Sequence, residues 1–112
     1  MALIKRGRLP TPLFNAHLYS PDGALIAIPD AWWPQAGVAA EVDSREWHLT
    51  PADWERTMRR HAQMSKHGII VLHFTPRKIR SEPASVIAAI AGAVEAGSAR
   101  PPLPVAARRA SA

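Results

Sequence analysis

The succession of strand, helix and strand between residues 38 and 74 is the feature that most constrains this fold. Residues 38–44 read VAAEVDS, which is typical of a short strand, and residues 69–74 read IIVLHF. A continuous apolar run of the second kind favours a strand that is covered on both faces. Two successive strands joined by a helix run parallel, with a right-handed crossover. The sequence therefore predicts a sheet that contains a parallel pair.

The helix between these strands has clear start and stop signals. Thr50 is a good N-cap, Pro51 suits the first helical position, and Asp53 favours the positive end of the helix dipole. Gly68 is typical of a helix C-terminus. A turn of 100° per residue predicts two faces. The buried stripe contains Trp54, Met58, His61 and Met64, and the basic ridge contains Arg56, Arg59, Arg60, Lys66 and His67.

The remaining segments complete the predicted order β-β-β-α-β-α, a mixed α/β fold with a mixed sheet flanked by helices. Strands at 13–19 and 24–30 should form a hairpin around the turn SPDG, and WWPQAG at 32–37 should turn the chain again. A basic loop is expected at 75–83 and a second helix at 84–96.

Length and composition indicate one intracellular domain. With 112 residues, no cysteine, and neither a signal peptide nor a membrane span, we expect a cytoplasmic protein. We expect a flexible arm at 1–8, a folded domain at 9–96 and a disordered tail at 97–112. Residues 1–49 carry four basic and five acidic side chains, whereas residues 50–112 carry ten and four. A basic surface beside an acidic pocket suits a polyanion held next to bound cations.

Three carboxylates, Asp30, Glu41 and Asp43, are expected near one end of adjacent strands. Two carboxylates about 4 Å apart repel by roughly 4 kcal/mol at an effective dielectric of 20, so a partly buried cluster requires a proton, a cationic side chain or a metal ion. Hard oxygen ligands select Mg²⁺ or Mn²⁺, and His48 is close enough in sequence to act as general acid or base. The alternative is a solvated acidic strand edge. His61 and His73 are interpreted as core histidines rather than ligands.

A family resemblance follows from these residues. Pro29-Asp30, ten intervening residues and Glu41-Val42-Asp43 resemble the PD-(D/E)xK nuclease signature, and EVDSREWH resembles the strand end of very-short-patch-repair (Vsr)-like endonucleases and their bacterial relatives of unknown function. The resemblance runs from about Leu9 to Val94 and takes in PDAWWP, DWERTMRRHAQMSKHG and IIVLHFT. It implies a restriction-endonuclease-like core and metal-dependent cleavage of DNA.

The resemblance also implies roles for single residues. Asp30 matches a metal-binding aspartate, Glu41 the second acidic position, and His48 a histidine near the scissile phosphate. Arg60 matches an arginine on the following helix. Asp43 stands where the superfamily has a lysine that orients the attacking water, so this sequence departs from the pattern at that position.

Three functional hypotheses remain open at this stage. The first is a Mg²⁺- or Mn²⁺-dependent DNA endonuclease that contacts phosphates through basic side chains, against the alternative of a plain solvated face. Those side chains are Arg56, Arg59, Arg60, Lys66, Arg77 and Lys78. The second is an inactive DNA- or protein-binding module of a defence or toxin–antitoxin system. The third is a truncated, non-functional gene product, because the enzymes that this sequence resembles usually begin with a helix that contributes an acidic residue, and only a short arm precedes Leu9 here. The alternative is that this segment is encoded elsewhere or supplied by a partner protein.

Overall fold

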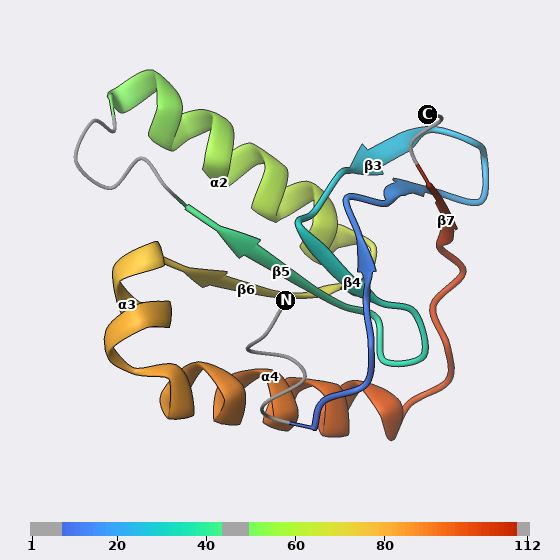
Figure 1. Cartoon of the computed structure of the whole chain (residues 1–112). Helices are drawn as coiled ribbons and strands as arrows, with labels where there is room; N and C mark the ends of the chain where they lie inside the picture. Colours follow the sequence, from blue (N-terminus) through green and yellow to red (C-terminus); the bar gives the residue numbers. More distant parts are fainter. Residues whose placement is uncertain (1–7, 44–49, 110–112) are drawn as a thin grey trace.

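The structure is a computed structural model that describes residues 8–43 and 50–109. Its described part forms the two-sheet arrangement drawn in Figure 1. The elements are β1 (Leu13–Phe14), β2 (His17–Tyr19), β3 (Leu25–Ala27), β4 (Ala31–Trp33), β5 (Val38–Val42), α2 (Pro51–Lys66), β6 (Ile70–Phe74), α3 (Pro76–Ser81), α4 (Pro83–Ser98) and β7 (Ala106–Arg108).

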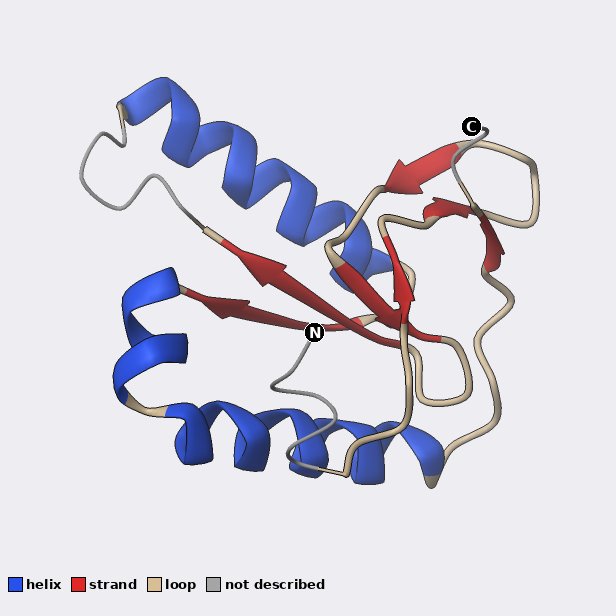
Figure 2. Ribbon diagram, in the orientation of Figure 1, coloured by secondary structure: helices blue, strands red, loops and turns tan. Residues whose placement is uncertain are grey.

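The chain has a mixed α/β fold, as predicted. A four-stranded sheet has the order β1-β4-β5-β6, in which β5 and β6 are parallel and the other neighbours antiparallel. A separate antiparallel sheet has the order β3-β2-β7. Helix α2 lies on one side of the larger sheet and α4 on the other, which Figure 2 shows clearly. The larger sheet is therefore the central layer of the molecule.

Alternation along β5 and β6 divides their side chains between two cores. Val38, Ala40 and Phe74 belong to the cluster under α4, together with Val86 and Ile90 of that helix. A second cluster joins Ala39 of β5 and Met64 of α2 with side chains of the smaller sheet. Because strand side chains alternate between faces, Glu41 and His73 lie on the α2 side. β6 contacts α2 and α4, but it is an edge strand in which residues 70–72 are only half-buried and His73 is exposed, so the predicted coverage of both faces is correct only in part.

Helix α2 confirms the predicted start and stop signals. The Thr50 side chain accepts a hydrogen bond from the Asp53 backbone N–H at 3.1 Å, and the Asp53 carboxylate accepts one from the Thr50 N–H. Gly68 follows the helix with a φ of +81°. The predicted burial of Trp54 and Met58 is wrong, since these side chains are 52% and 41% exposed. The buried residues of the helix are Thr57 and Met64.

The predicted hairpin and turns are correct only in part. β2 and β3 do form an antiparallel hairpin around residues 20–24. Residues 24–30 are not a single strand, because β3 ends at Ala27 and β4 begins at Ala31. The buried Trp32 and Trp33 belong to β4, where a turn was predicted, and the turn itself follows at residues 34–37.

Two segments predicted to be irregular are ordered elements. Pro76–Ser81 forms the short helix α3, whose N-cap Thr75 accepts a hydrogen bond from the Lys78 backbone N–H. The second predicted helix is confirmed as α4. The prediction of a disordered tail from residue 97 is wrong for the described part, because β7 pairs with β2. Upstream of β7, Leu103 packs against the second cluster.

Candidate functional site at the carboxyl ends of β5 and β6

The register of the larger sheet brings the predicted acidic residues to one end of β5. Glu41 is paired with His73 across the parallel strands. Ala31 is paired with Ala40, so Asp30, immediately before β4, lies level with Glu41. Asp43 continues β5, and its backbone N–H donates a hydrogen bond to the carbonyl oxygen of Phe74 at 2.8 Å. Ligand sites of α/β proteins commonly form at such carboxyl ends of parallel strands.

Glu41 is a buried carboxylate held by a cation from α2. Its residue exposure is only 6%. The Arg60 side chain donates to both carboxylate oxygens, with a distance of 3.1 Å from Nε to Oε1. A planar guanidinium is well suited to this bidentate contact. Of the three ways to neutralise a buried carboxylate, the described residues therefore supply a cationic side chain.

Asp30 lies beside this ion pair but makes a different contact. Its Oδ2 accepts a hydrogen bond from the backbone N–H of Val42 at 2.7 Å, and the residue is exposed. The contact ties the segment before β4 to the end of β5. It leaves a solvent-accessible aspartate next to the charged end of the sheet.

Two histidines that the sequence assigned to the core meet on the same side of the sheet. Nδ1 of His61, on α2, lies 2.9 Å from Nε2 of His73, on β6. Although the His73 side chain is exposed, partial burial of its ring lowers its pKa. The charges of Glu41 and Asp43 oppose this effect, and His61 and Arg60 reinforce it. Sequence reasoning missed this pair, although the spacing of Met64 and His61 on the buried side of α2 was a usable signal.

The described residues fit a divalent metal ion only in part. Among residues 8–43 and 50–109, no three His, Asp or Glu side chains are grouped so that they could hold a metal ion. Mg²⁺ is often held by one or two carboxylates, with waters and phosphate oxygens completing the shell. Glu41, one of the three predicted metal ligands, is bound to Arg60. The predicted acid or base His48 lies outside the described residues.

The predicted basic ridge is not one continuous surface. Arg60 points to the sheet rather than along the ridge, since it binds Glu41. Arg56 is paired with Asp53, and Arg59 lies 3.9 Å from Glu55, so both have carboxylate neighbours on the helix.

The other three predicted phosphate contacts, Lys66, Arg77 and Lys78, are exposed at opposite ends of β6. Lys66 ends α2 just before that strand, whereas Arg77 and Lys78 lie on α3 just after it. At a rise of about 3.3 Å per residue, the five residues of β6 separate these positions by more than about 10 Å. The carboxylates thus share their end of the sheet with Arg77 and Lys78, not with Lys66.

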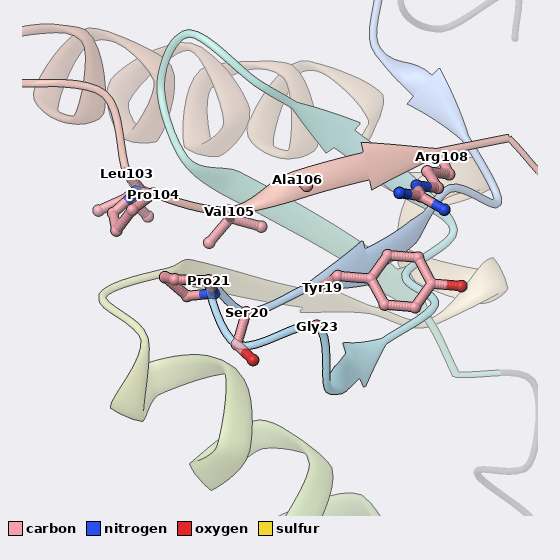
Figure 3. A pocket seen from close by; sticks show the side chains of 9 residues that line it. All are labelled: Tyr19, Ser20, Pro21, Gly23, Leu103, Pro104, Val105, Ala106 and Arg108. Atoms are coloured by element: carbon pink, nitrogen blue, oxygen red, sulfur yellow. The ribbon is translucent and has the colours of Figure 1, made fainter.

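A cavity of about 530 Å³ lies elsewhere, between the β2–β3 turn and the segment that leads into β7 (Figure 3). The Arg108 guanidinium lies 5.6 Å from the ring centroid of Tyr19, a cation–π contact at one side of this cavity. Arg108 is the one charged residue in its lining. The lining of this cavity therefore contains none of the carboxylates and histidines found at the carboxyl ends of β5 and β6.

Within the described residues, no helix is long and apolar enough to cross a membrane. The fold and the site define a mixed α/β domain with an acidic and histidine-containing site beside a parallel strand pair.

The chain is similar to two uncharacterized proteins from two strains of Mycobacterium tuberculosis. It is 31% identical to each over 91 residues, which are 81% of this chain and 33% of each relative. The chain therefore spans about one third of the length of these relatives. No family model matches the sequence. No solved structure matches it either.

Proposed function

We propose that this chain is a Vsr-like, PD-(D/E)xK-type endonuclease domain that hydrolyses phosphodiester bonds of DNA with the help of Mg²⁺ or Mn²⁺. The observation that carries the proposal is the arrangement of Asp30, Glu41 and Asp43 around one end of β5. The sequence resemblance assigns roles to these same positions. The proposal places the domain in the bacterial cytoplasm, where DNA is accessible.

The charged groups suit separate tasks within this activity. Asp30 and Asp43 would hold the metal ion, which would polarise a phosphate oxygen and favour ionisation of a bound water. Arg77 and Lys78 would attract the DNA backbone, because exposed cations position phosphates without reading sequence. The buried Glu41 and the half-buried Arg60 form an ion pair that would hold α2 against β5 near the reacting groups.

The test is a cleavage assay with a matched pair of variants. The chain would be incubated with Mg²⁺ or Mn²⁺ and single-stranded, nicked, mismatched and intact duplex DNA. Asp30→Asn should abolish cleavage, whereas Asp22→Asn, in the β2–β3 turn, should leave it unchanged. The enzymatic proposal is wrong if all four substrates stay intact with both Mg²⁺ and Mn²⁺. It is also wrong if Asp30→Asn and Asp22→Asn are equally active.

A second candidate is a DNA- or protein-binding module without catalysis, as in a defence or toxin–antitoxin system. The neutralisation of Glu41 by Arg60 favours it, because one acidic group already has a cation. Asp43 in the lysine position favours it as well. DNA binding that weakens steeply with salt and does not respond to Mn²⁺, together with no cleavage, would support this candidate over the first.

A further inference from the structure

β6 has a free strand edge without the features that normally protect such an edge from association. It is the last strand in the order β1-β4-β5-β6, and with five residues it is the longest edge strand in the described part of the chain. Edge strands are usually protected by charged side chains, proline, bulges or very short length. The sequence of β6, IVLHF, has no lysine, arginine, carboxylate or proline, and its pairing with β5 has a regular register. Its free edge is therefore a template for a further strand.

The hydrogen bonds between β5 and β6 identify the backbone groups at this edge. The Ile70 N–H donates to the carbonyl oxygen of the residue before β5 at 3.0 Å, and the Phe74 carbonyl oxygen accepts from the Asp43 N–H. Because the backbone groups of a strand point alternately to its two sides, Val71 and His73 direct their N–H and C=O groups away from β5. No described strand lies on that side, and His73 is exposed. A strand of another molecule can therefore pair with β6 at this residue.

One flank of α2 extends over the free edge and carries no charge. Arg60 reaches β5 and His61 reaches β6, so the His61 side of the helix faces the edge. At 100° per residue, the exposed residues farther around on that side are Trp54, Met58, Ala62 and Ser65. We call these four residues the uncharged flank. Exposed apolar groups with a charged rim are typical of protein interaction surfaces.

The position of α2 over the sheet suits a second copy of this chain. Because α2 contacts both β5 and β6, its axis lies between these strands, about 2.4 Å to the side of β6, which is half the usual strand spacing. Two antiparallel β6 strands about 4.8 Å apart, related by a two-fold axis, would then place the two α2 axes about 10 Å apart on the same face of the sheet. Packed helices have interaxial distances of about 8–10 Å, so the two uncharged flanks would meet.

Charges at the rim of the uncharged flank are complementary in the same arrangement. Glu55 and Lys66 are exposed near opposite ends of α2, and His61 is halfway between them in sequence. His61 lies level with His73, so a two-fold axis beside His73 would bring Glu55 of each copy opposite Lys66 of the other. The same axis would join the two His73 residues by main-chain hydrogen bonds. Partial burial lowers the pKa of His73 below 6.5, so the facing rings are mainly neutral at pH 7.5.

We propose that the free edge of β6 and the uncharged flank of α2 bind a second copy of this chain in a two-fold symmetric dimer. The two β6 strands pair antiparallel and join the two four-stranded sheets into one continuous sheet. The two α2 helices pack side by side across the axis. This dimer does not depend on the endonuclease proposal, because its test measures molecular mass rather than DNA cleavage.

The test is sedimentation velocity of the untagged chain at pH 7.5, at concentrations from about 1 μM to about 200 μM, the range expected for a modest interface. The mass should rise from that of the 12.2 kDa monomer to twice that value. Glu55→Lys and Lys66→Glu should each raise the Kd of dimerisation at least about fivefold, because each places like charges together at two symmetry-related contacts. The variant with both substitutions regains opposite charges at these contacts, so its Kd should return to the wild-type value.

Two matched pairs of variants test the strand edge and the helix flank separately. His73→Pro removes the N–H that points to the partner, whereas His73→Gln keeps it, and both lose the contact with His61. Proline is tolerated where the N–H of an edge strand faces away from its sheet. The dimer should therefore be lost in His73→Pro and retained in His73→Gln. Met58→Lys should raise the Kd at least about tenfold, because it buries a charge between the helices, whereas Gln63→Lys, about 140° away on α2, should not change it.

Circular dichroism checks that each variant is folded. A wild-type chain that stays monomeric up to about 200 μM would overturn the inference, because a Kd above this range is too weak for a specific dimer, and the edge would then be left for a strand of a different protein. A dimer that persists in His73→Pro, or a double charge exchange that fails to recover dimerisation, would also overturn it. So would an equal loss of dimer in Met58→Lys and Gln63→Lys.

Discussion

The ion pair between Arg60 and Glu41 predicts a strong asymmetry between the two partners. The Glu41 side chain is 7% exposed and that of Arg60 is 40% exposed. Arg60→Met would leave a buried carboxylate without its cation, whereas Glu41→Gln would leave a guanidinium that can still reach water. Losing one partner of a buried pair costs about 3–5 kcal/mol, and the partial exposure here favours the lower end, about 3 kcal/mol. Glu41→Gln should cost about 1 kcal/mol, because an amide still accepts a hydrogen bond.

These values can be measured by urea unfolding followed by tryptophan fluorescence, with circular dichroism as a second probe of two-state behaviour. For a domain of this size, about 3 kcal/mol corresponds to a fall in Tm of about 10–15 °C. Arg59→Met is the matched control, because Arg59 is 69% exposed and lies 3.9 Å from Glu55. It should change the free energy of unfolding by less than about 0.5 kcal/mol. The reasoning is refuted if Arg60→Met is no more damaging than this control, or if Glu41→Gln costs as much as Arg60→Met.

Two further predictions concern α4 and the pH dependence of stability. A Cβ at Gly92 would meet nothing within 4 Å, so Gly92→Ala should stabilise the protein by about 0.5–1 kcal/mol. A Cβ at Gly97 would overlap the carbonyl oxygen of Ala36, so Gly97→Ala should destabilise it by about 1–3 kcal/mol, and equal effects in urea unfolding would contradict this contrast. Because the folded pKa of His73 is below its ordinary 6.5, the unfolded chain binds protons more readily, and the contribution of this group, complete above pH 6.5, is lost as pH falls through the folded pKa. His73→Gln should flatten the decline in unfolding free energy between pH 7 and pH 5, and a slope identical to wild type would count against this assignment.

The parts of the fold that were predicted correctly are those controlled by local chemistry. The cap at Thr50, the stop at Gly68 and the parallel crossover between β5 and β6 each depend on residues close in sequence. β4 was missed because Trp32 and Trp33 are followed by Pro34, which suggests a turn. Their burial depends on pairing with β1 and β5, which no local pattern encodes.

The helix face was predicted less well than the helix itself. Thr57 and Met64 are seven residues apart and define the buried stripe of α2. Trp54 and Met58 lie about 60° and 100° around the helix from Thr57, so they project to one side of that stripe. Hydrophobicity alone suggests that these two side chains are buried. However, β6 is the edge strand of its sheet, so no further strand is present to cover a helix face that projects beyond it.

The sequence predicted that the acidic residues of the candidate site would lie close together, but it did not predict the contacts that they make. The sequence indicated that Asp30 and Glu41 would lie near one another, and it indicated that a buried carboxylate needs a counter-charge. Which cation supplies that charge depends on the rotation of α2 about its axis, which also decides whether His61 reaches His73. A small change in that rotation would have left the two histidines apart.

The pairing of β2 with both β3 and β7 has a consequence for how the protein folds during its synthesis. β3 follows β2 after a short turn, whereas β7 lies roughly 90 residues further along the chain. During translation, the hairpin can form early, but the free side of β2 must wait until β7 has left the ribosome. An unpaired strand edge is a template for pairing with other chains. The nascent protein therefore passes through an interval in which its smaller sheet is exposed to intermolecular association, and this interval closes only when β7 is added.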